Sequence, residues 1–216
     1  TIRNNSGNGI KAADNAEVNI KNNTISGHSG GKSITITQGA FANIESNTIT
    51  GTSGQIAVRI SHGSSANIKS NTIQSADNGI LVQDSSHAFL KNNTVKSNSN
   101  DGLYVDNNAS VVLAEGNTFS NNTEYGIRVW LGGSLNMYIR TARTSPTTVS
   151  GNTKGSIHIG GGGSAYLSYL TLSSPTSGII AEKGAALSMR NITIANSQKE
   201  GVNLRGATAY IDNATI

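Results

Sequence analysis

Apolar and polar residues alternate along short stretches of this chain, and similar stretches recur from end to end. Alternation with a period of two predicts a short strand with one buried face. One kind of stretch lies just before a Thr-Ile pair and has small or apolar residues at every second position, as in Ala16/Val18/Ile20, Ala40/Ala42/Ile44, Ser64/Ala66/Ile68 and Ala185/Leu187/Met189. A second kind follows a glycine, as in residues 79–82 (GILV), 102–105 (GLYV) and 126–129 (GIRV). The Thr-Ile pair itself is a third short extended piece.

The Thr-Ile pair, or a close variant of it, recurs at a nearly constant spacing. Its first residue stands at Thr1, Thr24, Thr48, Thr72, Thr94, Thr118, Thr148, Thr171, Thr193 and Thr215. Eight of the nine intervals are 22–24 residues long, and the interval of 30 residues indicates an insertion. A single coil cannot bury its apolar face, but stacked coils share one core. The sequence therefore predicts an all-β chain with one domain over residues 1–216, a β-solenoid of about nine coils with three short strands each. With about 4.8 Å between coils, the rod would be about 45 Å long.

A leucine-rich repeat is the main alternative, because its period overlaps with this one. That repeat needs Leu at several fixed positions in each unit. Here Ile, Val and Ala fill the apolar positions, and each unit has three extended pieces without a helical period. The pattern favours the β-solenoid.

The order small-x-apolar-x-Ile, then Asn-Thr-Ile, then Gly-Ile-x-Val resembles the right-handed parallel β-helix repeats of the pectate-lyase-like superfamily, over essentially the full chain. In such helices, the resemblance implies, Asn residues stack from coil to coil in a turn. Five Asn residues share one register and would form such a ladder: Asn23, Asn47, Asn71, Asn93 and Asn117. In later coils this register holds Thr147, Leu170, Ile192 and Ala214, so the ladder is expected to stop.

Composition agrees with this fold and excludes some functions. The chain has 25 Gly and only two Pro, and Ile outnumbers Leu about two to one, which favours strands and turns over helices. The net charge of +4 is spread along the chain and gives no argument for binding nucleic acid. The absence of Cys excludes disulfides and thiolate chemistry, and no apolar run is long enough to embed this segment in a membrane. The chain opens on Thr1-Ile2 without an initiator Met, so we expect an excerpt of a longer chain.

Residues of the same register become neighbours in space when coils stack. The x position of the Gly-Ile-x-Val strand is expected to point outward, and its column reads Lys11, Thr35, Arg59, Leu81, Tyr104, Arg128, His158, Ile180 and Asn203. With the two positions that follow the end of this strand, the middle coils bring together Arg59, His62, Asp84, Tyr104, Asp106, Arg128 and Trp130 on one side of the rod. Guanidinium groups beside aromatic rings suit an anionic glycan, because rings stack on sugars and Arg forks bind carboxylates. Trp130, the only Trp, is the key residue of this reading, with a partly buried structural anchor as its alternative.

The same cluster allows an enzymatic alternative. Enzymes of the pectate-lyase-like superfamily, as the resemblance implies, place catalytic groups on this face, often with Ca²⁺ and an Arg base. The catalytic candidates are Asp84, Asp106, Arg59, His62 and Tyr104. Two carboxylates are few for Ca²⁺, which takes six to eight oxygen ligands, so calcium is a weak expectation and no other cofactor is expected. The four His fall in four registers and predict no metal site. A solvated polar strip without chemistry is a further alternative.

The insertion, at about residues 138–146, carries two cations, Arg140 and Arg143. A basic loop next to Trp130 strengthens the prediction of an anionic glycan or acidic partner, although a merely tolerated surface loop is as consistent with the pattern. Downstream, roughly the last 40 residues resemble the passenger domains of bacterial autotransporters, with Gly-Ala before an apolar alternation. This resemblance implies a secreted or cell-surface adhesin.

Three classes of function follow. The first is a secreted, periplasmic or cell-surface bacterial β-helix that presents its exterior face to a polysaccharide, above all an anionic one, or to a host or cell-surface protein. Its ligand-binding candidates are Arg128, Trp130, Tyr104, Arg59, Arg140 and Arg143. The second is a polysaccharide lyase, C5-epimerase or hydrolase acting on acidic glycans. The third is a purely structural fibre segment.

Overall fold

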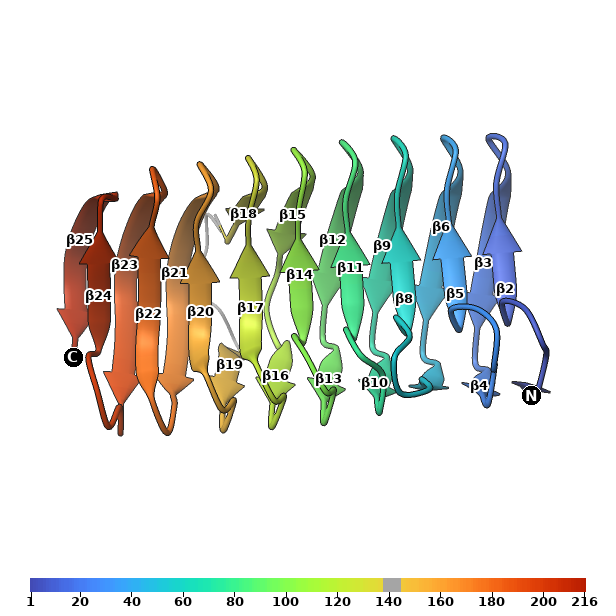
Figure 1. Ribbon diagram of the computed structural model, residues 1–216, viewed down its shortest axis with the longest axis horizontal. Coiled ribbons are helices and arrows are strands. Elements are labelled where there is room, and N and C mark those ends of the chain that lie inside the picture. The colour runs from blue at the N-terminus through green and yellow to red at the C-terminus, as the bar shows by residue number, and fades with distance from the viewer. Residues whose placement is uncertain (138–144) are drawn as a thin grey trace.

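A computed structural model describes residues 1–137 and 145–216 of the chain. In these two ranges every regular element is a strand, and the strands stack as a parallel β-helix with one end at each terminus (Figure 1). The predicted β-solenoid of about nine coils is confirmed. Within the same ranges, no helix is long and apolar enough to cross a membrane.

Two sheets run the length of the rod. The nine-strand sheet faces the viewer in Figure 1; it consists of β2 (Ile10–Ala12), β5 (Ile34–Ile36), β8 (Val58–Ile60), β11 (Ile80–Val82), β14 (Leu103–Val105), β17 (Tyr125–Val129), β20 (Gly155–Ile159), β22 (Ser177–Glu182) and β24 (Val202–Arg205). All its pairs are parallel.

The sixteen-strand sheet contains the remaining strands in two rows that merge at the C-terminal end. One row is β3 (Glu17–Lys21), β6 (Phe41–Glu45), β9 (Ser65–Lys69), β12 (His87–Lys91), β15 (Ser110–Leu113) and β18 (Ser134–Asn136). The other is β1 (Ile2–Arg3), β4 (Thr24–Ser26), β7 (Thr48–Thr50), β10 (Thr72–Gln74), β13 (Thr94–Lys96), β16 (Thr118–Ser120) and β19 (Thr147–Ser150). Both rows join the long strands β21 (Ser164–Ser173), β23 (Ala186–Ala195) and β25 (Thr208–Thr215).

The register of the stack follows the Thr-Ile repeat. Thr48 pairs with Thr24 on one side and with Thr72 on the other. The pairing continues through Thr118 and Thr148 across the longer interval, so the extra residues are accommodated outside the ladder. The predicted alignment of the coils is confirmed.

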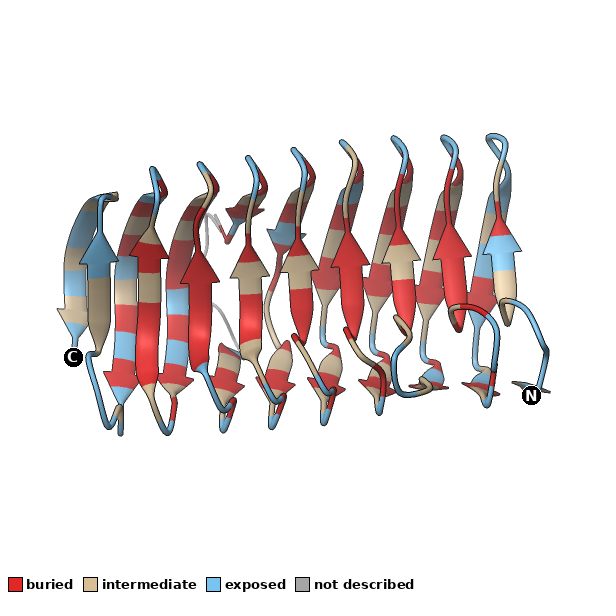
Figure 2. Cartoon of the chain, viewed as in Figure 1, coloured by how far each residue is buried: buried red, intermediate tan, exposed pale blue. Residues whose placement is uncertain are grey.

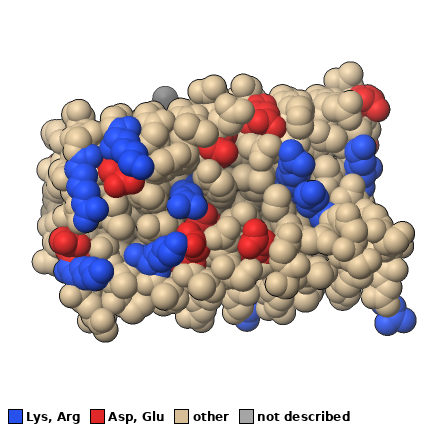
Figure 3. All heavy atoms as spheres, viewed as in Figure 1, with Lys and Arg blue, Asp and Glu red and all other residues tan. Residues whose placement is uncertain are grey.

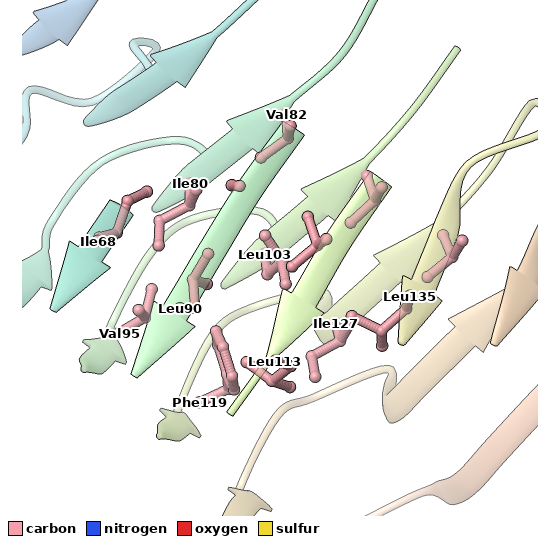
Figure 4. Packing of buried hydrophobic residues seen from close by; sticks show 14 of the residues in the cluster. Ile68, Ile80, Val82, Leu90, Val95, Leu103, Leu113, Phe119, Ile127 and Leu135 are labelled. Carbon is pink, nitrogen blue, oxygen red and sulfur yellow. The ribbon is translucent and has the colours of Figure 1, made fainter. Parts of the chain in front are cut away.

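One continuous apolar core fills the interior of the rod. Inward residues such as Ile49, Ile68 and Phe119 are fully buried, and buried positions recur along most of the rod (Figure 2). The buried side chains of successive coils pack on one another (Figure 4). Burying a side chain of this size contributes about 1.5–3 kcal/mol, so the stacked coils stabilise each other. The last coil is the exception, because Ile211 lies in the core register and is still 44% exposed.

The predicted Asn ladder is present, and its members are hydrogen-bonded from coil to coil. The backbone N–H of Asn47 donates to Oδ1 of Asn71 at 2.9 Å, and that of Asn71 donates to Oδ1 of Asn93 at 3.0 Å. The side-chain amide of each Asn donates to backbone carbonyls, as from Asn71 to Ile44 at 2.9 Å. Buried polar groups need such partners to avoid a desolvation cost of about 1–3 kcal/mol each.

A second ladder, not foreseen in the sequence, stands in another turn. The N–H of Asn98 donates to Oδ1 of Asn122 at 3.1 Å, and the N–H of Asn122 donates to Oδ1 of Asn152 at 3.0 Å. All three Asn are buried. They follow the repeat Thr by four residues, so the signal was readable at the same 24- and 30-residue spacings.

The expectation of three short strands in each coil is wrong for the last three coils. There the strand that precedes the Thr-Ile pair and the Thr-Ile strand merge into β21, β23 and β25, each of which runs through the former turn. The ladder register in this part holds Leu170, Ile192 and Ala214, which pair with one another in the sheet. Leu170 and Ile192 are buried, so in these coils an apolar side chain occupies the position of the ladder Asn that lies in the turn of earlier coils.

Each strand of the nine-strand sheet ends in a left-handed turn, and these turns position part of the candidate site. Backbone φ is positive at His62 (54°) and Asp84 (56°), and also at Asn107 and Leu131 in the next two coils. Asn and Asp tolerate this conformation, whereas it is rare for Leu. The turn therefore directs residues immediately after each strand toward one edge of the sheet.

Candidate functional site

The outer face of the nine-strand sheet holds the predicted column of strand-centre residues in the predicted order. Arg59 pairs with Leu81, Tyr104 with Arg128, and so on through the stack. The expectation that every side chain of this column is exterior is wrong for Thr35, Leu81 and His158, which are 7%, 7% and 6% exposed. Thr35 and Leu81 each lie between longer side chains of the neighbouring coils. His158 packs instead against the rings of Tyr125 and Trp130.

A pocket of about 370 Å³ lies over the first three coils of this face. It is called the cation pocket here, and its lining is Asn8, Lys11, Lys32, Thr35, Thr37, Gln38, Arg59, Ser61 and His62. Three permanent cations and one His line it, and no carboxylate of the described residues does. In Figure 3 Lys and Arg side chains gather toward the N-terminal end of this face, whereas in its middle Asp and Glu lie close to the Lys and Arg.

Short polar side chains hold the walls of the cation pocket. Asn8 Oδ1 accepts a hydrogen bond from the Lys32 N–H at 2.8 Å. On the other side, Ser61 Oγ donates to Thr37 Oγ1 at 3.2 Å, and Thr37 Oγ1 lies 3.2 Å from His62 Nδ1. Arg59 Nε is buried and has no hydrogen-bond partner among the described residues. The charged guanidinium of Arg59 at the pocket wall suits an oxyanion ligand.

Asp84 borders this pocket and is already held by its neighbours. Its carboxylate lies 3.7 Å from His62 Nδ1 and accepts hydrogen bonds from Gln83 at 2.7 Å and Asn107 at 2.9 Å. The hydrogen bond from Gln83 is the main cause that lowers the pKa of Asp84, against the opposing effect of burial. This carboxylate therefore stays charged and fixed in place.

The middle coils carry a second group of charges, the Arg128 cluster, which is made of Asp101, Tyr104, Glu124, Tyr125, Arg128 and Lys154. The guanidinium carbon of Arg128 lies 5.5 Å from the ring centre of Tyr104 and 5.3 Å from that of Tyr125. Its Nη1 is 3.3 Å from Asp101 Oδ2 and 3.8 Å from Glu124 Oε2. Lys154 forms a further ion pair with Glu124. The positive charges of this cluster are thus compensated within the protein.

Asp101 is the residue of this cluster that sequence reasoning missed. Its side chain is fully buried, and burial raises its pKa to about 6, while Arg128 acts in the opposite direction. Oδ1 of Asp101 accepts the Tyr125 N–H at 3.0 Å, just as Oδ1 of Asn78 accepts the Asp101 N–H one coil earlier, at 3.1 Å. Asp101 therefore replaces an amide in a coil-to-coil ladder, and the Asn or Asp before a glycine in three of the units, at Asn8, Asn78 and Asp101, was its signal.

Tyr104 and Asp106 are two residues apart, and each affects the pKa of the other. Burial is the main cause that raises the pKa of Tyr104 to about 12, and the charge of Asp106 adds to it. Burial also raises the pKa of Asp106. Asp106 Oδ1 is buried and has no hydrogen-bond partner in the described part of the chain.

Trp130 packs against the following coil. Its ring centre lies 5.1 Å from that of His158, and a Cβ on Gly160 would overlap the indole. The Lys183 ammonium lies 5.2 Å from the indole centre on a later coil. Trp130 is only half-buried and so could still offer an edge to a ligand, but its contacts are those of an anchor.

His158, under that indole, is a buried polar group rather than an exposed one. Its Nε2 lies 3.3 Å from Glu182 Oε1, and its ring centre is 4.7 Å from that of Tyr125. Burial lowers the pKa of His158, and the hydrogen bond with Glu182 opposes this effect.

Two predicted ligand residues, Arg140 and Arg143, lie outside the described residues, as does most of the predicted insertion. Among residues 1–137 and 145–216, no group of three or more His, Cys, Asp or Glu is arranged to hold a metal ion. Calcium binding at Asp84 and Asp106 stays a prediction.

The fold and the columns on its outer face define a parallel β-helix of stacked, register-matched coils. A family model described as "Right handed beta helix region" matches residues 1–144, and the chain belongs to this family. The predicted resemblance to right-handed parallel β-helices of the pectate-lyase-like type is thereby confirmed. No curated protein sequence matches the chain.

One solved structure shares the fold over most of the chain. It is the A-module of the mannuronan C-5 epimerase AlgE6 from Azotobacter vinelandii, with 14% sequence identity and a TM-score of 0.57. The match covers 90% of this chain and 64% of the epimerase module, and at this identity it shows the fold alone. A second match, a TibC-catalyzed hyper-glycosylated TibA fragment at 12% identity, covers 95% of this chain and 98% of the fragment. Because its TM-score is only 0.15, this second match does not indicate a shared fold. The resemblance of the last coils to autotransporter passenger domains stays a prediction.

Proposed function

We propose that the protein binds an acidic polysaccharide along the outer face of the nine-strand sheet and that the cation pocket anchors it. The observation that carries this proposal is a pocket of about 370 Å³ that is lined by Lys11, Lys32, Arg59 and His62 and by no carboxylate from residues 1–137 and 145–216. A uronate or sulfate group would pair with the Arg59 fork and the two ammonium groups, because charge-assisted hydrogen bonds are the strong ones.

The rest of the face supports an extended ligand. Tyr104 and Tyr125 are half-buried and lie a few coils further along the same face, where their exposed edges could contact sugar rings. The structural neighbour is named as an enzyme of mannuronan, a uronate polymer, which agrees with a glycan partner. We also propose that the protein acts outside the cytoplasm as a secreted, periplasmic or cell-surface binding protein, since its polymeric ligand would be met there.

The experiment is a binding titration with polymannuronate and polygalacturonate, with dextran as the uncharged reference. The native chain is expected to bind the two polyuronates, more weakly as salt rises, and not dextran. Arg59→Ala and Lys11→Ala should each weaken polyuronate binding about tenfold, the loss expected for a hydrogen bond to a charged group. Lys96→Gln removes the same charge from β13 on the other sheet and is the matched control.

Two outcomes would contradict the proposal. If the native chain binds neither polyuronate, the proposal is wrong and a purely structural fibre segment becomes the better interpretation. If Lys96→Gln lowers the affinity as much as Arg59→Ala, binding reflects the net charge and not a site.

A second candidate, an enzyme that acts on the same acidic polymer, is favoured by one observation. Asp106 has a raised pKa and a buried, unpartnered Oδ1 next to Tyr104. A carboxyl with such a pKa can transfer protons closer to neutral pH, as a lyase, C5-epimerase or hydrolase requires. Tyr104 itself, with a pKa of about 12, keeps its proton at neutral pH and could therefore serve as a proton donor but not as the resting-state base.

This candidate is tested by incubating the protein with the two polyuronates. New unsaturated ends, new reducing ends or inverted C5 centres in NMR spectra would support it, provided that Asp106→Asn abolishes them and still binds polymer. No turnover on either polymer would leave binding as the function.

A further inference from the structure

The outer face of the sixteen-strand sheet carries a second groove, far along the chain from the cation pocket. It has a volume of about 320 Å³ and lies over β18, β21, β23 and β25. Tyr166 and Tyr210 line it, with Ser188 between them in the same register. The parallel column two residues upstream is formed by Ser164, Ala186 and Thr208. This groove is called the tyrosine slot.

The slot arises because large and small residues alternate from coil to coil. Neighbouring coils are about 4.8 Å apart, so Tyr166 and Tyr210 stand about 10 Å apart. A ring midway between them would lie about 5 Å from each phenol, which is within the stacking range of ring pairs. A third Tyr in place of Ser188 would leave no room for a ligand. In the N-terminal coils the same column instead holds Asn19, Asn43 and Asn67, whose amides bond to one another at 2.9 Å.

The lining of the slot selects an uncharged ligand. None of the described side chains that line it carries a charge, in contrast to the cation pocket. The nearest charges along these strands, Arg190 and Asp212, pair with each other at 3.1 Å. Hydroxyl groups of Ser164, Ser188 and Thr208 surround the apolar walls. Aromatic walls with a few hydroxyls at the floor and rim are the composition that suits a sugar ring, whose faces are apolar and whose edge carries hydroxyls.

We propose that the tyrosine slot binds one neutral sugar unit of a glycan, stacked between Tyr166 and Tyr210 with its hydroxyls toward Ser188 and Thr208. This site does not depend on the acidic polymer proposed for the nine-strand sheet. Tyr210 is 64% exposed, so its ring is available at the surface and can be changed without opening the core.

The test is a titration of the full chain with neutral oligosaccharides of gluco, galacto and manno configuration, followed by calorimetry or NMR. At least one of the three series is expected to bind. Tyr210→Ala should weaken that binding at least fivefold, because it removes one stacking wall. Ser188→Tyr should abolish binding although it adds an aromatic ring, because it fills the gap. Tyr169→Asn, which changes an exposed Tyr of β21 outside the slot, is the matched control and should leave binding unchanged.

Four outcomes would overturn the proposal. The first is that none of the neutral series binds, and the second is that Ser188→Tyr binds as well as the native chain. The third is that Tyr169→Asn is as damaging as Tyr210→Ala. The fourth is that a Trp- or Phe-containing peptide, and no sugar, occupies the slot. Arg59→Ala is expected to leave sugar binding at the tyrosine slot intact. A failure of the tyrosine-slot proposal can therefore be told apart from a failure of the acidic-polymer proposal.

Discussion

The cation pocket and the Arg128 cluster lie on the same sheet and contain similar residue types, yet their charges are handled differently. In the cation pocket Lys11, Lys32 and Arg59 face a cavity that no carboxylate lines. In the Arg128 cluster the guanidinium lies between two Tyr rings and is paired with Asp101 and Glu124. The first arrangement leaves positive charge available for a ligand, whereas the second uses it to satisfy a buried carboxyl. A cation in the right column is therefore not sufficient to mark a binding site.

The largest expected difference is in stability. Arg128→Ala leaves the fully buried Asp101 without its cation, and such a change costs about 3–5 kcal/mol. Since Arg128 is itself 26% exposed, we expect the lower end of this range for the loss in the free energy of unfolding at pH 7. Denaturant unfolding measures it. The double variant Arg128→Ala/Asp101→Asn should recover most of the loss, and a failure to recover would show that Arg128 acts through packing alone.

The second prediction concerns the pH dependence of stability. Asp101 has a folded pKa of about 6, above its ordinary value of 3.8, so the folded state binds the proton more tightly than the unfolded state. Its stabilising contribution is complete below about pH 4 and is lost as the pH rises through 6, by about 3 kcal/mol in total. Asp101→Asn should remove this part of the pH profile. Equal slopes between pH 4 and pH 7 in the two proteins would contradict the shifted pKa.

Trp130→Ala is expected to cause a smaller loss of stability. It also tests whether the indole anchors the neighbouring coil or binds the polymer. Because the ring covers His158 and Gly160, its loss should lower the free energy of unfolding by about 2 kcal/mol. Polyuronate affinity should fall less than in Arg59→Ala. If Trp130→Ala proves the more damaging of the two for binding, the polymer is centred on the middle coils and not on the cation pocket.

The smallest change in stability is expected for Arg59→Ala itself. This residue has no ion pair within the described residues, and its Nε has no hydrogen-bond partner there, but its side chain lies over Thr35 and Leu81. The free energy of unfolding should therefore fall by no more than about 1 kcal/mol. Polyuronate affinity should nevertheless fall about tenfold. A large loss of stability would mean that Arg59 supports the fold, as Arg128 does.

Most of the fold could be predicted from the repeat. The Thr column from Thr24 to Thr215 and the strand-centre column from Lys11 to Asn203 occur in the predicted register. Local spacing suffices for this, because a coil of constant length returns each residue to the same side of the rod. The merged strands β21, β23 and β25 were not foreseen, because the loss of the ladder Asn predicted where the ladder stops but not that the sheet continues through the turn.

The candidate site was predicted only in part. The columns correctly brought Arg59, Tyr104 and Arg128 onto one face. Asp101 was not included in these columns, because it lies in the turn before the strand. The column that contains His158 was predicted to be exposed throughout, but His158 is buried. The register of the repeat gives the neighbours of a residue but not the conformations of long side chains. These conformations decide which side chains are buried and which charges are paired.

By itself, the sequence determined that this chain is a stacked β-helix, which residues form its core, and which side chains become neighbours along the rod. These properties follow from periodicity, since one register applies to every coil. Only the tertiary structure decided that Arg128 is neutralised by Asp101, that Trp130 covers His158, and that the uncompensated cations and the tyrosine slot lie elsewhere. The physical reason is that pairing and burial depend on distances of a few ångströms between side-chain ends, and a repeat of 22–24 residues specifies backbone register only.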